Sequence, residues 1–178
     1  VINLPNKEIL MMEGFSSSET TRYNYIPDVW NPNTNTLRRL TNASTEQRSV
    51  QHLYPWLHVA PNGKVFYSGA TVSMAYLETT GTGSWSTTYQ RDALARGAGS
   101  SVMYDLGKIL VLGGGIPGTN TAVTVNLTNS VQASATGSMS SARTNPNATI
   151  LADGTVFVNG GNTSGINFDD STSIYTTE

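Results

Sequence analysis

The sequence predicts an all-β, kelch-like propeller of four-stranded antiparallel blades, of which about four are present. The first observation is a repeat of a turn, an apolar run and a closing glycine, found at Pro61–Gly69, Leu106–Gly114 and Asp153–Gly161. These copies recur about 45 residues apart, within the period of roughly 40 to 50 residues that is typical of propeller blades. The second observation is that Asn-Gly or Asp-Gly opens the apolar run in two copies, which favours a tight hairpin.

The strands of each blade follow from this unit in order. The first two strands pair across the hairpin, and the second is almost continuously apolar because neighbouring blades cover both of its faces. The outer strand follows a second turn, with Leu37 in the first blade and Trp85 in the second as its large apolar residue. The third strands are predicted at Tyr25–Trp30, Ser73–Thr79, Thr121–Leu127 and Thr172–Thr176.

The predicted blades span about residues 1–41, 48–88, 97–139 and 141–178, and the last lacks an outer strand. An open arc of four blades exposes an apolar face at each end. We therefore expect either a closed four-bladed ring or completion by partner sequence, namely the remaining blades of a seven-bladed parent or a second copy.

Composition excludes several classes of function. Charged residues make up only 12% of the chain, the net charge is -2 and the pI is about 5.6, so no basic field attracts nucleic acid. No apolar run reaches the roughly 20 residues that span a bilayer, so we expect no membrane role. Cysteine is absent, which removes disulfides and thiolate chemistry.

The low charge, with a surface rich in Ser, Thr and Asn, favours a secreted, extracellular protein. Glycosylation requires Asn-x-Ser/Thr, and this pattern makes the protein a candidate glycoprotein. The candidate acceptors are Asn42, Asn126, Asn147 and Asn162.

The segment Gly99–Gly114, with Val-Met-Tyr-Asp followed by Gly-Lys-Ile-Leu and Gly-Gly, resembles the corresponding strand pair of the galactose oxidase and glyoxal oxidase family. The likeness extends in order over almost the whole chain. It implies a secreted, seven-bladed copper radical oxidase as parent, which oxidises alcohols or aldehydes with O2 and produces H2O2. In this family two tyrosines and two histidines hold the copper, and one tyrosine is cross-linked to a cysteine.

The resemblance places all of these copper ligands outside residues 1–178, so we expect this chain alone to hold no cofactor and to be inactive. Phe15 matches the aromatic that stacks over the radical tyrosine. Tyr54-Pro55 stands where galactose oxidase has a Tyr-Arg pair that contacts the sugar, which argues against galactose specificity and favours a glyoxal-oxidase-like relative. Phe15, Tyr54, Trp56 and Arg143 are the candidate ligand-facing residues.

Other candidate chemistry has a simpler structural interpretation. His52 and His58 share a strand face but stand about 20 Å apart when extended, too far for one metal ion. Arg143, like the arginines near the other blade junctions, either contacts an anionic ligand or bonds interblade carbonyls. The alternative function is a non-catalytic, glycan-binding or structural extracellular propeller, for which the ligand is a carbohydrate rather than a small alcohol or aldehyde.

Two polar clusters are also assigned to turns. Asn31, Asn33 and Asn35 alternate as calcium ligands do, but no acidic residue closes the loop, so turn formation is the preferred interpretation. Asp169 and Asp170 are adjacent and fit a turn cap better than a paired-carboxylate site.

Overall fold

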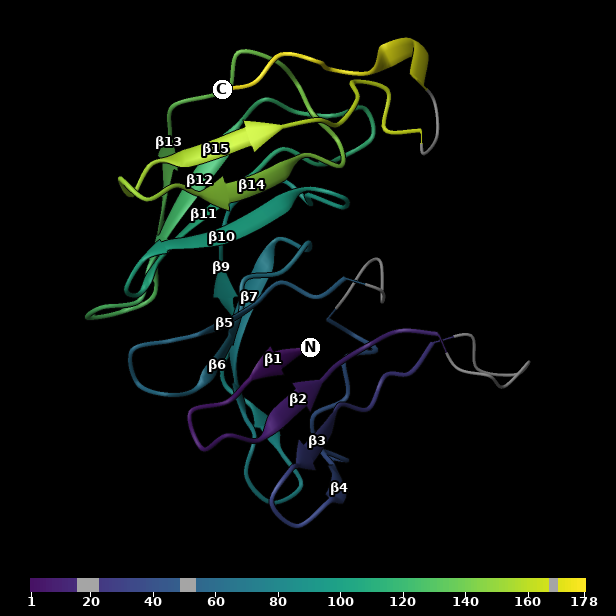
Figure 1. The fold of residues 1–178 in the computed structure, drawn as a ribbon, viewed down its shortest axis with the longest axis vertical. Helices are drawn as coiled ribbons and strands as arrows, with labels where there is room; N and C mark the ends of the chain where they lie inside the picture. Colours follow the sequence, from purple (N-terminus) through teal and green to yellow (C-terminus); the bar gives the residue numbers. More distant parts are fainter. Residues whose placement is uncertain (16–22, 49–53, 167–169) are drawn as a thin grey trace. The chain divides into compact units, whose positions relative to one another are not determined.

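The predicted all-β propeller fold is confirmed by a computed structural model, which describes residues 1–15, 23–48, 54–166 and 170–178. Strands β1 to β15 follow one another along the chain, and the helical element among these residues is a single 3-10 turn, η1 (Asp170–Thr172) (Figure 1). Within the described residues, no helix has the length and apolar character needed to cross a bilayer.

The chain divides into two compact units. The first comprises Val1–Gly69 with Ser73–Tyr89, and the second comprises Ala70–Val72 with Gln90–Glu178. Each unit contains two antiparallel sheets, whose strands lie in sequence order.

The first unit contains two meandering sheets. The first sheet is built from β1 (Ile2–Asn3), β2 (Ile9–Met11), β3 (Asp28–Asn31) and β4 (Thr36–Arg39). The second is built from β5 (Leu57–Val59), β6 (Val65–Tyr67), β7 (Ser73–Glu78) and β8 (Ser84–Trp85). A fifth strand, β9 (Tyr89–Gln90), also pairs with β7 and was not predicted.

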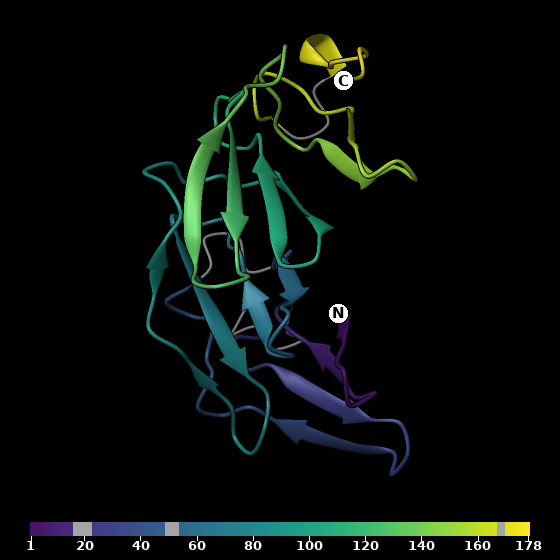
Figure 2. The same ribbon diagram turned by 90° about the vertical axis from the view of Figure 1, so that its left-hand side faces the viewer.

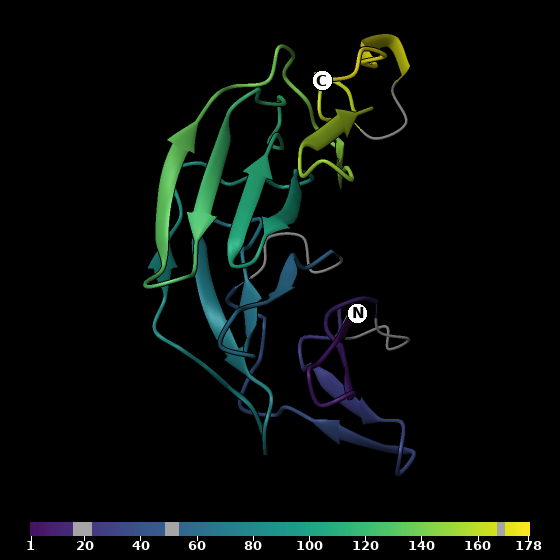
Figure 3. The ribbon, with the colours of Figure 1, turned by 60° about the vertical axis from the view of Figure 1, so that its left-hand side comes forward.

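The second unit contains the most regular sheet, seen as side-by-side arrows in Figure 2. It is built from β10 (Ser100–Asp105), β11 (Lys108–Leu112), β12 (Ala122–Asn126) and β13 (Gln132–Thr136). The hairpin of β14 (Asn147–Ile150) and β15 (Val156–Asn159) packs its first strand against β10 (Figure 3).

The predicted hairpin turns form for the expected reason. Gly63, Gly107 and Gly154 all have positive φ, at 77°, 71° and 85°. L-residues with a Cβ rarely adopt this region, whereas glycine enters it at no steric cost. The turn glycines therefore set the position at which each chain reversal occurs.

One strand prediction was wrong: Thr172–Thr176 does not form a regular third strand in the last sheet. Its first residue ends η1, and Ser173 then forms an isolated bridge with Asn162, beyond the end of β15. Ile174 donates its N–H to Gly161, and Val158 and Glu178 exchange two backbone hydrogen bonds. A ladder needs consecutive pairs, and these pairs are separate from one another.

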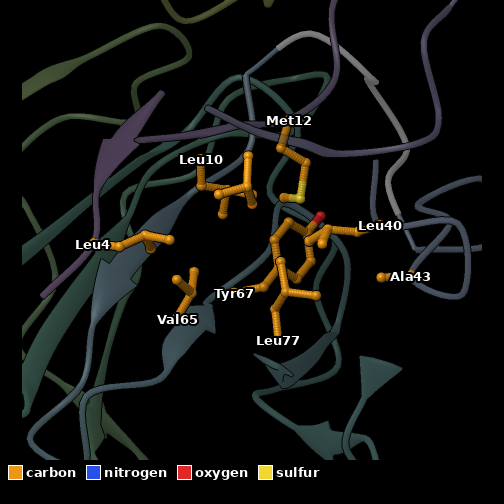
Figure 4. Close-up of a cluster of buried hydrophobic side chains, with 9 residues drawn as sticks. Leu4, Leu10, Met12, Leu40, Ala43, Val65, Tyr67 and Leu77 are labelled. Atoms are coloured by element: carbon orange, nitrogen blue, oxygen red, sulfur yellow. The ribbon is translucent and has the colours of Figure 1, made fainter. Parts of the chain in front are cut away.

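Side chains of both sheets meet in the core of the first unit (Figure 4). Leu10 on β2 and Leu77 on β7 are both 0% exposed. Burying a leucine in this way contributes roughly 1.5–3 kcal/mol. The cluster consists of Leu4, Leu10, Met12, Val29, Leu40, Ala43, Val65, Tyr67 and Leu77.

A smaller core joins the two sheets of the second unit. Leu112 on β11 and Ala122 on β12 pack with Val158 on β15 and with Met139 from the intervening loop. Leu110, Ala148 and Val156 extend this cluster while partly buried. The hairpin β14–β15 is thus held to its neighbouring sheet by apolar packing.

Candidate functional site

Phe15, a predicted ligand-facing residue, lies at the end of a loop in the first unit with 65% of its surface exposed. It forms a bridge with Tyr23, and their rings stack with centroids 5.6 Å apart and planes 22° from parallel. Tyr25 then packs against Tyr23 at 6.2 Å. The three rings form what we call the aromatic stack, which presents the Phe15 ring to solvent.

Tyr23 and Tyr25 were missed as site candidates. The sequence signal was the Tyr-Asn-Tyr alternation, because residues two apart in extended chain lie on the same side. An exposed aromatic face of this kind binds apolar groups and the apolar faces of sugars. The aromatic stack thus has the geometry of a surface that suits an uncharged ligand.

Tyr54 and Trp56 lie in the segment that leads into β5, in the second sheet of the same unit. Tyr54 is 77% exposed, and Trp56 is partly buried. The Trp56 carbonyl accepts the Ser68 N–H at 3.0 Å, which ties this segment to the end of β6. Tyr54 is thus accessible to a ligand, while Trp56 helps to hold its own loop.

Arg143, the fourth candidate, is 0% exposed. Its guanidinium donates to the carbonyls of Gly160 and Thr176, both at 2.8 Å, and to Glu178 Oε1 at 2.8 and 3.1 Å. All of these hydrogen bonds are made to residues of the second unit. The carbonyl partners lie within the same predicted blade, 141–178, whereas the alternative to anion binding was contact with carbonyls of a neighbouring blade.

Arg96 repeats this arrangement one blade earlier. Its side chain is 2% exposed and donates to the carbonyls of Gly113 at 3.1 Å and Thr121 at 2.8 Å, while Asp92 balances its charge at 3.0 Å. Gly113 and Gly160 each follow the second strand of a sheet. The two buried arginines therefore serve as structural ties at equivalent positions.

Arg48 makes a third, different junction contact. Its guanidinium carbon lies 4.6 Å from the centre of the Trp85 ring, a cation–π geometry. Burial of the side chain lowers the pKa of Arg48. Trp85, predicted as an outer-strand residue, is therefore part of this junction as well as of β8.

Copper does not fit the residues that the structure describes. Among them, no group of three or more His, Asp or Glu side chains is arranged to hold a metal ion. Burial lowers the pKa of His58 to about 4, so this imidazole is neutral at pH 7. His52 lies outside the described residues, and the sequence contains no cysteine for a cross-link.

The remaining polar clusters take part in turns. Asn31 Oδ1 accepts the Asn33 N–H at 2.9 Å and the Thr34 N–H at 3.4 Å, which is an Asx turn rather than a calcium loop. Asp170 begins η1, whereas Asp169 lies outside the described residues.

The candidate acceptor asparagines differ in exposure. Asn42, Asn126 and Asn147 are exposed, whereas Asn162 is buried.

Comparison with known proteins gives two informative matches. Galactose oxidase of Gibberella zeae (strain PH-1) is 31% identical over 176 residues, covering 85% of this chain and 26% of the relative. A solved fungal alcohol oxidase of the AA5 family, described as having catalytic diversity and as a copper complex, superposes with a TM-score of 0.88 at 28% identity. That match covers 99% of this chain and 39% of the other.

A weaker structural match supports the fold alone. The protein YjhT superposes with a TM-score of 0.67 at 14% identity, over 86% of this chain and 56% of its own. No protein-family model matches the chain.

The repeated antiparallel sheets, each of the last two braced by a buried arginine, define the chain as a partial β-propeller. It is a homologue of galactose oxidase, and the predicted kinship to the galactose oxidase and glyoxal oxidase family is confirmed. The chain spans about a quarter of the length of the curated relative that it matches.

Proposed function

We propose that this chain is the propeller scaffold of a secreted, galactose-oxidase-like enzyme whose reaction is oxidation of an alcohol or aldehyde by O2 to give H2O2. The observation that carries the proposal is the match of 99% of the chain to a copper-containing fungal alcohol oxidase at a TM-score of 0.88. Homology to galactose oxidase points to the same class of oxidoreductase.

In this proposal the copper ligands belong to polypeptide outside residues 1–178, and the chain alone does not catalyse oxidation. The described residues contain no three-ligand cluster, and cysteine is absent from the sequence. Copper, when bound by the complete protein, supplies the redox chemistry. The role of this chain is to hold loops in place and to offer a ligand surface.

The aromatic stack is the part of that surface best suited to a substrate. Phe15 is exposed to solvent, and the Tyr23 ring stacks against it. An uncharged aromatic face favours apolar alcohols, aldehydes or the apolar side of a sugar over anions. Pro55, following the exposed Tyr54, has no backbone N–H and cannot supply the hydrogen bonds of an arginine at that position.

The division between scaffold and copper site can be tested with two proteins. The first is the 178-residue chain, loaded with Cu2+, desalted and assayed for copper content and for H2O2 with galactose, benzyl alcohol and methylglyoxal. The second is Gibberella zeae galactose oxidase in which the matched segment is replaced by this chain. We expect copper and H2O2 production in the chimera and neither in the isolated chain.

Either of two results would contradict the proposal. Stoichiometric copper with H2O2 production by the isolated chain would show that the ligands lie within it. A chimera that is folded by circular dichroism but takes up no copper would show that the segment does not serve as an oxidase scaffold. The unmodified galactose oxidase is the control for assay and metal loading.

A second candidate is a non-catalytic, carbohydrate-binding or structural propeller completed by further blades or a second copy. The exposure of Phe15 and Tyr54, at 65% and 77%, favours this alternative, because exposed rings are frequent in sugar-binding surfaces. Copper-independent binding on a glycan array, lost in Phe15→Ala, would support it. An inactive but copper-loaded chimera together with such binding would favour it over the oxidase.

A further inference from the structure

We propose that Asn126 is an N-glycosylation site and that its first sugar lies in the polar groove beside it on the β10–β13 sheet. The inference rests on the secretory route included in the proposed function. It selects one of four candidate acceptors by the local geometry of its side chain and by the space next to it.

Asn126 ends β12 and is exposed, and its sequon continues into the turn before β13. Its Oδ1 accepts the Thr128 backbone N–H at 2.9 Å and the Thr128 hydroxyl at 2.7 Å. The sequon is therefore folded as an Asx turn, with the required hydroxyl against the carboxamide. The Nδ2 group, which is the atom modified, belongs to an exposed residue at the end of the strand.

A groove of about 180 Å³ adjoins this side chain. Asn126 lies directly opposite Lys108 on one neighbouring strand and Gln132 on the other, so all three project from the same face of the sheet. Tyr104 and Ser134 are also among the residues that line the groove. Hydrogen-bonding groups around one ring are suited to a pyranose, whose faces are apolar and whose edge is polar.

The other acceptors lack this combination. Asn162 is 8% exposed, its Nδ2 donates to the Ile166 carbonyl at 3.1 Å, and its Oδ1 accepts from Gly165 at 2.7 Å. A glycan there is incompatible with the folded loop. Asn42 is exposed, but its Nδ2 donates to Thr82 Oγ1 at 2.9 Å. Asn147 lies in β14, where its backbone is extended rather than turned.

The chemical step is a transfer from a lipid-linked oligosaccharyl pyrophosphate. Asn126 Nδ2 forms a bond to the sugar C1 while the C1–O bond to the pyrophosphate breaks. The pyrophosphate leaves with the bonding electron pair, and Nδ2 loses one proton. No oxidant or reductant is required.

The modification is tested by translating the chain behind a secretion leader in the presence of pancreatic microsomes. This assay reads each added glycan as a gel shift that an endoglycosidase removes, whether or not a variant folds. We expect a shift that is lost in Asn126→Gln and Thr128→Ala and is retained in Thr128→Ser and in the matched control Asn147→Gln. Absence of a shift in the unmodified sequence, or a pattern unchanged by Asn126→Gln, would overturn the site assignment.

The position of the sugar is tested separately. For this the protein is secreted from yeast, and its glycan is trimmed to a single N-acetylglucosamine. A ring current from Tyr104 should move the N-acetyl methyl resonance upfield, and Tyr104→Leu should abolish that shift while the site stays occupied. An unshifted resonance in the trimmed glycoprotein would overturn the groove assignment. Oxidase activity of the bacterially produced, unglycosylated chimera is an independent readout, so failure of this inference and of the proposed function are distinguishable.

Discussion

Replacing Arg143 by alanine should strongly destabilise the second unit, because the guanidinium is completely buried and makes four hydrogen bonds. Its loss removes the donors to Gly160 and Thr176 and leaves the Glu178 carboxylate without its cation. Breaking a buried, hydrogen-bonded ion pair costs about 3–5 kcal/mol. With a urea m value of about 2 kcal/mol/M, the unfolding midpoint should fall by about 1.5–2.5 M.

Arg38 provides a matched control with the same kinds of partner in a partly exposed setting. It donates to the carbonyls of Thr79 at 2.7 Å and Gly81 at 2.8 Å and pairs with Glu8 at 3.2 Å, but its side chain is 36% exposed. Exposed pairs contribute about 0–1 kcal/mol. Arg38→Ala should therefore shift the midpoint by about 0.5 M or less, and an equal effect of Arg38→Ala and Arg143→Ala would refute the assignment of the cost to burial.

The same contact has a pH signature. Burial of the Glu178 carboxyl raises its pKa, but hydrogen bonds from Ser140 and Arg143 outweigh this effect and hold the pKa below its ordinary value. The stabilisation is thus present above the ordinary glutamate pKa of about 4.3 and is lost as the pH falls through the lowered value. In Arg143→Ala, the stability lost on acidification should be smaller, as measured by urea unfolding at pH 3 to 6.

Three further changes test the core, the glycine positions and the buried histidine. Leu77→Ala removes a side chain that is 0% exposed and should lower the free energy of unfolding by about 2–5 kcal/mol, whereas Leu37→Ala, at 59% exposure, should change it by less than about 0.5 kcal/mol. Equal effects in chemical denaturation would contradict the core assignment. Gly161→Ala should be more destabilising than Gly160→Ala, because both have positive φ but only the Cβ at Gly161 would lie 2.5 Å from a backbone carbonyl. A thermal melt in which Gly160→Ala is the worse variant would argue against the tight junction. The His58 imidazole should titrate near pH 4 by NMR. Because burial lowers this pKa, the contribution of His58 to stability is present above about pH 6.5 and is lost as the pH falls toward 4. A titration midpoint near pH 6.5 would contradict the burial of His58.

The predicted blade anatomy was most accurate where apolar alternation and turn glycines agreed. The third strand predicted at Thr121–Leu127 forms as Ala122–Asn126, and the one predicted at Ser73–Thr79 forms as Ser73–Glu78. The prediction failed at Thr172–Thr176, where a 3-10 turn takes up the first residue and the rest forms no ladder with the preceding strand. β9 was missed because two residues carry too little pattern to be recognised.

The site predictions had a similar limit. Phe15 and Tyr54 were predicted to face ligand and are exposed, whereas Arg143 is buried and donates to carbonyls and a carboxylate 17 to 35 residues further along the chain. A sequence contains the arginine but not the positions of its acceptors. The stacking of Tyr23 on Phe15 is likewise a contact that only the tertiary structure shows.

The repeat of glycine-closed apolar strands determined the all-β fold, since hairpin turns and strand burial are encoded in neighbouring residues and need no long-range information. The relationship to galactose oxidase could be predicted for the same reason, because contiguous residues of one strand pair indicated it. Only the tertiary structure decided which polar side chains are structural and which are accessible. Asn162 and Asn126 belong to the same sequence motif, yet one is enclosed by its loop and the other lies open beside a groove. Burial and hydrogen-bond partners arise from residues far apart along the chain, so local pattern cannot specify them.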